Sequence, residues 1–188
     1  MKKQGFTLIE LMVVIVIMGI LAAVAVPKLF GMIAKSKASE VGPAAGTYVK
    51  LQDAYAAESN AIGTWALIGY SMPGSTQFTY AEDASTLTIT CSTGTLNSET
   101  KKCEVSNSDG AKSEGVVGTS TYSEAWSASN KAQLNDCTAG KNWKISAQIN
   151  QSGASVSAGS VVYDATVTGT GCQALTPTFT NIGRTSNN

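Results

Sequence analysis

A hydrophobic segment near the N-terminus constrains this chain more than any other feature of its sequence. From Phe6 to Val26 the only charged residue is Glu10. As an α-helix at 1.5 Å per residue this stretch is about 32 Å long, which is enough to cross a bilayer. An ordinary secretory signal has a shorter apolar region without an acid and is cleaved after it. We therefore predict a membrane-spanning helix over residues 6–27.

Glu10 is the anomalous residue of this segment. An acidic side chain inside hydrocarbon costs on the order of 3 kcal/mol by insertion scales, so it is kept there only for a reason. One reading is a carboxylate that reaches the interface or interacts with the helix dipole. The other is a pairing group: cleavage after Gly5 would leave an amine on Phe6, and that amine on a neighbouring chain could neutralise Glu10 and set the register between copies.

The N-terminal residues resemble the prepilin signature of the type IV pilin family, which includes the type II secretion pseudopilins, and they are most like those of a type IVa major pilin. The resemblance rests on Lys2-Lys3-Gln4-Gly5-Phe6-Thr7-Leu8-Ile9-Glu10-Leu11-Met12 and continues to Gly19 and Pro27. It implies that residues 1–5 are a leader that a prepilin peptidase removes after Gly5. It also implies that Phe6 is N-methylated and that identical subunits polymerise through the retained helix.

The same resemblance implies a location and a set of partners. Before assembly the subunit would cross the bacterial inner membrane once, with its N-terminus inside, and would meet the prepilin peptidase/N-methyltransferase and the pilus assembly machinery. Afterwards it would be part of an extracellular filament. Positive charge alone barely decides the orientation, because Lys2, Lys3 and the amino terminus are balanced by Lys28, Lys35 and Lys37.

The cysteines favour the orientation with the C-terminal part outside the cytoplasm. All four lie in the second half of the chain, widely spaced and without a Cys-x-x-Cys pair, which indicates disulfides in an oxidising compartment. Three connectivities are possible. We favour Cys91 with Cys103, because the stretch 92–102 contains Gly and Asn and can bend back on itself, which leaves Cys137 with Cys172. Four buried free thiols are the alternative.

Residues 28–58 have the pattern of an amphipathic helix. Apolar side chains recur at three- and four-residue steps, namely Leu29, Ile33, Val41, Ala45, Tyr48, Leu51 or Gln52, and Tyr55. Together with the membrane segment this predicts a helix of about 50 residues whose upper half packs a head. Gly19, Pro27 and Gly42–Pro43 are positions where we expect a bend or local melting, although membrane helices also tolerate such residues.

The remaining residues, 59–188, predict a globular, β-rich head. Short alternating runs at 86–90, 143–149 and 161–167 are typical of antiparallel strands, and Trp65–Tyr70 is expected to tie the helix to the sheet. The fold class is therefore α+β: a long N-terminal α-helix, transmembrane and then amphipathic, packed on a C-terminal antiparallel sheet. This is the fold that the resemblance to type IV pilins implies.

Several functional classes are disfavoured by the residues themselves. The chain contains no histidine, which argues against most acid–base and nucleophilic catalysis, and its 13 basic and 13 acidic residues give no net charge that would attract nucleic acid. We predict no catalytic activity, no cofactor and no metal. The basic groups Lys101–Lys102 and Lys141–Lys144, with Trp143 available for stacking, could contact DNA, but two small basic groups are more often a solvated face. The spacing of the acids does not match a known calcium loop; these are Asp109, Glu114, Glu124 and Asp136.

The leading hypothesis is a structural subunit of a type IV pilus that supports adhesion, motility or uptake. A type II secretion pseudopilin and a minor or competence pilin are the alternatives within the family. A membrane-tethered periplasmic binding or enzymatic domain is the alternative from another class. A simple tether would not need Glu10.

Overall fold

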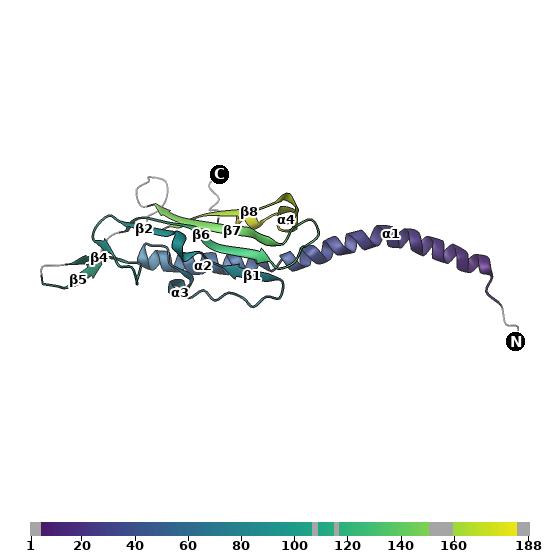
Figure 1. The fold of residues 1–188 in the computed structure, drawn as a ribbon, viewed down its shortest axis with the longest axis horizontal. Coiled ribbons are helices and arrows are strands. Elements are labelled where there is room, and N and C mark those ends of the chain that lie inside the picture. Colours follow the sequence, from purple (N-terminus) through teal and green to yellow (C-terminus); the bar gives the residue numbers. More distant parts are fainter. Residues whose placement is uncertain (1–4, 107–108, 115–116, 151–159, 184–188) are drawn as a thin grey trace.

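An extended helix and a β-rich head make up the protein (Figure 1). The computed structural model describes residues 5–106, 109–114, 117–150 and 160–183. The N-terminal half of the helix projects away from the head, and its second half lies along the sheet. The architecture is the expected α+β arrangement, in which a long apolar helix precedes an antiparallel sheet.

The long helix consists of α1 (Leu8–Ala38) and α2 (Val41–Ser59), with a turn between them at 39–40. α1 continues through Gly19 and Pro27, so of the expected sites of bending only Gly42–Pro43 lies near this interruption, in the first turn of α2. Pro43 has no N–H to donate to the residue four positions earlier, and its ring crowds that carbonyl. The helix therefore restarts with Pro43 in its first turn, where the missing N–H leaves no bond unmade.

The head covers the helix from Ala34 onward. The buried face begins with small side chains and continues with larger ones: Ala34, Ala38, Val41, Ala45, Tyr48 and Gln52. The sequence pattern had placed Leu29 and Ile33 in this packing stripe, and that interpretation was wrong, because both side chains are exposed. Their period is right for a helix, but α1 turns its alanines toward the head and its larger side chains away from it.

In the described part of the chain, the larger sheet has five antiparallel strands in the order β1-β6-β7-β8, with β2 also paired to β6. Their bounds are β1 Phe78–Ala81, β2 Leu87–Cys91, β6 Val117–Asn130, β7 Gly140–Asn150 and β8 Val162–Val167. β1 pairs with the C-terminal end of β6 and β2 with its N-terminal end. β2, β7 and β8 correspond to predicted strands, whereas the central strand β6 was not predicted.

A smaller sheet lies at the end of the head farthest from the N-terminus (Figure 1). Its described strands are β3 (Thr95–Leu96), β4 (Cys103–Ser106) and β5 (Lys112–Glu114), in that order. The Cys91–Cys103 disulfide joins this sheet to β2. The second disulfide, Cys137–Cys172, joins the turn after β6 to helix α4 (Thr170–Leu175). Both bonds of the favoured pairing are therefore present.

Helix α3 (Trp65–Ile68) and the residues after it connect α2 to the sheet, as expected for Trp65–Tyr70. The Trp65 Nε1–H donates to the carbonyl of Ala125 at 2.8 Å. The Tyr70 hydroxyl donates to the carbonyl of Ala44 at 3.2 Å and accepts from Trp126 Nε1 at 3.0 Å. Two short 3-10 turns, η1 (Ala84–Thr86) and η2 (Phe179–Asn181), complete the described elements.

Candidate assembly site

The first turn of α1 is closed by a capping box between Thr7 and Glu10. The Thr7 backbone N–H and hydroxyl both donate to Glu10 Oε2, at 2.9 and 2.7 Å, and the Glu10 N–H donates to Thr7 Oγ1 at 3.4 Å. This arrangement satisfies backbone donors that a helix N-terminus otherwise leaves open. The sequence signal was available, because a Thr three residues before a Glu is the pattern of such a box, yet Thr7 was not among the predicted site residues.

The capping box holds the Glu10 carboxylate but leaves its charge unpaired by any cation in the described residues. Glu10 is exposed, and so is Phe6 one turn before it. Phe6 lines two shallow hollows on either side of the helix, one with Ile9, Glu10, Val13 and Val14 and the other with Leu8, Leu11 and Ile15 among its walls. The N-terminal end of α1 thus presents one carboxylate surrounded by apolar side chains.

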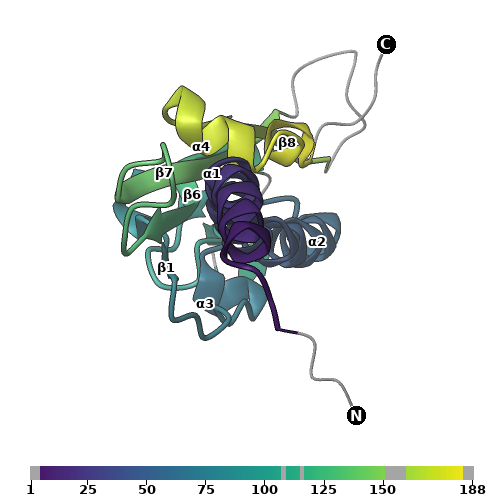
Figure 2. The same ribbon diagram turned by 90° about the vertical axis from the view of Figure 1, so that its right-hand side faces the viewer.

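The apolar side chains of α1 are exposed along its whole projecting half. Figure 2 looks toward this end of α1, with the sheet and α2 behind it. The helical stretch Leu8–Ser59 contains a window long and apolar enough to cross a membrane, and the rest of the protein buries 0% of that window. Such a surface is stable only in lipid or against other apolar protein surface.

The other predicted residues of the N-terminal segment have different surroundings. Gly5 is exposed and precedes α1. A Cβ added at Gly19 would meet no atom within 4 Å, so within a single chain nothing sterically requires glycine there. Flexibility at Gly19, Pro27 and Pro43 stays a prediction, as do processing at Gly5 and Phe6 and the division of the chain at residues 5, 27 and 58.

Three of the candidate ligand residues on the head are engaged in structural contacts. Trp143 is fully buried and its Nε1–H donates to Thr176 Oγ1 at 2.8 Å, so its ring is not exposed for stacking on a base. Lys141 forms an ion pair with Glu124. Among the described residues, no group of three or more Cys, Asp or Glu side chains is placed to hold a metal ion.

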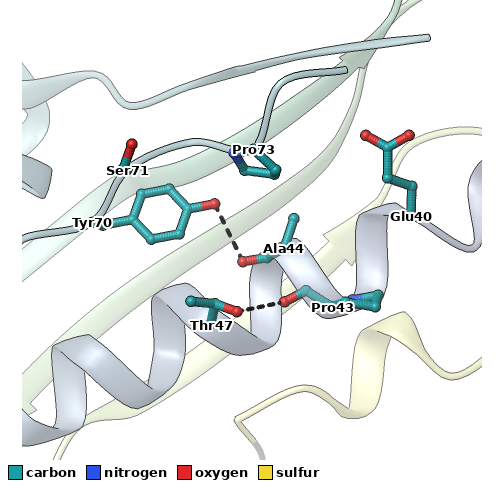
Figure 3. Close-up of a pocket in the computed structure, with 7 residues that line it drawn as sticks. All are labelled: Glu40, Pro43, Ala44, Thr47, Tyr70, Ser71 and Pro73. Carbon is teal, nitrogen blue, oxygen red and sulfur yellow. Dashed lines mark hydrogen bonds between the residues drawn. The ribbon is translucent and has the colours of Figure 1, made fainter. Parts of the chain in front are cut away.

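A groove lies beside the start of α2, between the helix and the loop that follows α3 (Figure 3). Its volume is about 330 Å³, and its lining residues are Glu40, Pro43, Ala44, Thr47, Tyr70, Ser71 and Pro73. The Tyr80 hydroxyl donates to Glu40 Oε1 at 3.0 Å. Burial first, and the hydrogen bond to Glu40 second, raise the pKa of Tyr80, so this phenol stays protonated.

The comparisons with known proteins concern the N-terminal region. Residues 1–26 match the family model described as the prokaryotic N-terminal methylation motif. Over 39 residues the chain is 56% identical to the type IV major pilin protein PilA of Myxococcus xanthus and 56% identical to a type IV major fimbrial protein FimA of Dichelobacter nodosus. Over 44 residues it is 54% identical to the fimbrial protein EcpC of Eikenella corrodens.

These matches cover 21% to 23% of this chain and 18%, 25% and 29% of the three relatives. No solved structure matches the chain. The predicted resemblance to type IV pilins is confirmed for the N-terminal segment, which carries the N-methylation motif of that family.

Proposed function

We propose that this chain is a structural subunit of a type IV pilus. The observation that supports the proposal most directly is the uncovered apolar length of α1, whose N-terminal end carries the methylation motif and one carboxylate. In this proposal the leader is removed after Gly5, Phe6 is N-methylated, and subunits polymerise through α1. The subunit crosses the inner membrane once, N-terminus inside, and afterwards stands in an extracellular filament that supports adhesion, motility or uptake.

Glu10 would provide the preference for the filament over the bilayer. Lipid tails are as apolar as the side chains of α1, so hydrophobic burial alone does not favour one environment over the other. A carboxylate, by contrast, is costly in hydrocarbon. Both Thr7 hydrogen bonds reach Oε2 of this carboxylate, and they supply no positive charge. The amine of Phe6 on a neighbouring subunit would supply that charge, and it becomes available only after cleavage.

The partners of this proposal follow from its steps. A prepilin peptidase/N-methyltransferase acts on the segment around Gly5 and Phe6, the inner-membrane assembly machinery extracts the subunit, and identical subunits receive it. The role is structural and requires no catalytic residue or cofactor.

Mass spectrometry of protein sheared from cell surfaces tests the proposal. The expected species begins at an N-methylated Phe6 and is recovered in abundant filaments. Recovery only from the inner membrane would contradict the pilus and favour the tether or a pseudopilin. A Gly5→Ala variant that still loses its leader would contradict the processing step.

A further inference from the structure

A patch of large apolar side chains lies on α1 between the predicted membrane segment and the head. Leu29, Phe30, Met32 and Ile33, here called the ridge, are 43% to 71% exposed. At about 100° per residue Leu29, Met32 and Ile33 point away from Ala34 and Ala38, which face the head. Phe30 lies one turn before Ala34 on the same side of the helix. No described head residue covers the ridge, and it lies beyond the stretch that hydrocarbon is expected to cover. A further protein surface is the natural partner for it.

Lys28 stands one helical turn before Met32, at the edge of the ridge. Between Leu11 and Ser39 the sequence has no acidic residue, and its charged residues are Lys28, Lys35 and Lys37. In the described residues Lys28 forms no ion pair. A partner that covers the ridge would partly desolvate this ammonium group, and a desolvated charge needs a counter-ion.

The groove in Figure 3 offers an apolar surface with such a counter-ion at one end. Glu40 stands one helical turn before Ala44 and lines the groove together with Pro43 and Tyr70. Among the described residues the Glu40 carboxylate accepts a hydrogen bond from Tyr80 and takes part in no ion pair. Two hydrogen bonds fix the Tyr70 side of the groove, because the Tyr70 hydroxyl donates to the carbonyl of Ala44 and accepts from Trp126 Nε1.

We propose that this groove receives the ridge of a second copy of the chain, with Lys28 of the second copy paired to Glu40. The proposal rests on the filament proposed above. The spacings agree, because Lys28 and Met32 are one turn apart on the ridge and Glu40 and Ala44 are one turn apart in the groove. Aligning the two pairs displaces the second copy by about 18 Å along the helix axis, toward the head.

This contact would propagate without closing. The ridge and the groove are different surfaces at different heights along the same helix, so the contact is heterologous, and repeated displacement along the axis produces an open polymer rather than a ring. Pairing Phe6 with Glu10 displaces a neighbour in the same direction by only about one turn. The two contacts therefore belong to different neighbours in the filament.

Charge distinguishes this groove from a larger one on the other flank of Pro43. That second groove, of about 470 Å³, is lined by Lys35 on α1 and by Leu175, Phe179 and Ile182 among other residues of the C-terminal segment. A ridge bordered by Lys28 would bring two ammonium groups together there, and like charges oppose docking. Glu40 makes the opposite contribution in the smaller groove.

Charge reversal tests the pairing in cells. Lys28→Glu and Glu40→Lys should each lower the yield of sheared filaments about tenfold, relative to subunit in the membrane, and the double variant should restore most of it. Lys37→Glu combined with Glu40→Lys is the matched control and should not restore filaments. Glu40→Gln keeps an acceptor for Tyr80, so a loss in this variant reports the charge and not the fold. A double variant no better than its single parents would overturn the proposal.

Cross-linking tests the register. With the four native cysteines paired, filaments of a Met32→Cys, Thr47→Cys variant should give a ladder of disulfide-linked copies on a non-reducing gel. Glu58→Cys in place of Thr47→Cys lies on a similar side of α2 but about 16 Å farther along the helix, and should give none. If the wild type forms filaments but the cysteine variant gives no ladder and the charge-reversal double variant gives no rescue, this contact alone is refuted. Absence of wild-type filaments would refute the proposed function. If lipid covers the ridge instead, the reversals leave the filament yield unchanged.

Discussion

The Tyr163 hydroxyl oxygen lies 2.8 Å from Asp53 Oδ1 and 3.2 Å from the carbonyl oxygen of Val49, which joins strand β8 to helix α2. Tyr80 on β1 makes the corresponding contact with Glu40. β1 and β8 stand at opposite ends of the strand order. Tyrosine–carboxylate hydrogen bonds therefore attach both sides of the sheet to the helix.

Removing the Tyr163 hydroxyl should weaken this attachment. Tyr163→Phe keeps the ring but deprives Asp53 and Val49 of their donor, so we expect the free energy of unfolding to fall by about 1–2 kcal/mol. Urea unfolding of the full chain in detergent measures this change. Thr166→Ala, at an exposed position of the same strand, is the control and should stay within about 0.5 kcal/mol of the wild type. An equal loss in both variants would contradict the assignment.

Alkaline pH should destabilise the head. Burial is the largest cause that raises the pKa of Tyr48, Tyr80, Tyr122 and Tyr163, with neighbouring carboxylates adding to it. The folded chain therefore retains protons that the unfolded chain releases near pH 10, and the stability that these protons represent is complete below that pH and lost as the pH rises above it. Unfolding midpoints measured from about pH 8 to 11 should decline, and less steeply in Tyr163→Phe. A flat profile would contradict the prediction.

The two disulfides should contribute unequally. Cys137–Cys172 closes a separation of 35 residues and both its cysteines are buried, whereas Cys91–Cys103 closes 12 residues and joins the smaller sheet to β2. The entropy removed from the unfolded chain grows with loop length. Replacing Cys137 and Cys172 by serine should therefore lower the free energy of unfolding by about 3–4 kcal/mol, and replacing Cys91 and Cys103 should lower it less. Denaturant unfolding of the two double variants compares them. Reduction should weaken the head before it affects α1, which circular dichroism would detect as retained helix.

Glu10 should act through its charge and not through the helix cap. Glu10→Gln keeps an oxygen that can accept from Thr7, so α1 and leader removal should be unaffected, while sheared filaments should fall about tenfold or more because the cationic partner is lost. Thr7→Val removes the cap, worth about 1 kcal/mol to the helix, and should leave filaments largely intact. Immunoblots of sheared and membrane fractions separate the two roles. A normal filament yield in the Glu10→Gln variant would contradict the proposed role of the Glu10 charge in assembly.

The N-terminal helix could be predicted from the sequence because its signal is local. A stretch from Phe6 to Val26 with one charge allows few structures, and the motif around Gly5 and Phe6 occupies consecutive residues. The packing stripe was predicted correctly from Val41 onward and wrongly for Leu29 and Ile33. Periodicity identifies a helix but does not say where along it a partner surface begins, and here the head first covers Ala34.

The head was harder to predict because its central strand does not alternate simply. In β6, Ser120 and Ser127 are buried, and the pairing with β7 shifts between Tyr122 and Trp126. Small polar residues and a register shift both obscure the two-residue period of a strand. The contacts of Glu40 with Tyr80 and of Asp53 with Tyr163 join residues far apart in the sequence, so no local sequence pattern predicts them.

The position of β6 implies an order of events as the head forms. β7 follows β6 after a short connection that contains the Leu134–Cys137 bridge. β1 and β2, by contrast, are separated from their pairing positions on β6 by much longer stretches of chain. Closing a short loop loses less entropy than closing a long one, so the β6–β7 hairpin is favoured to form first. It brings Trp126 and Trp143, both fully buried, into one sheet. The C-terminal segment is then locked by Cys137–Cys172, so oxidation of that pair closes a head whose hairpin is already in place.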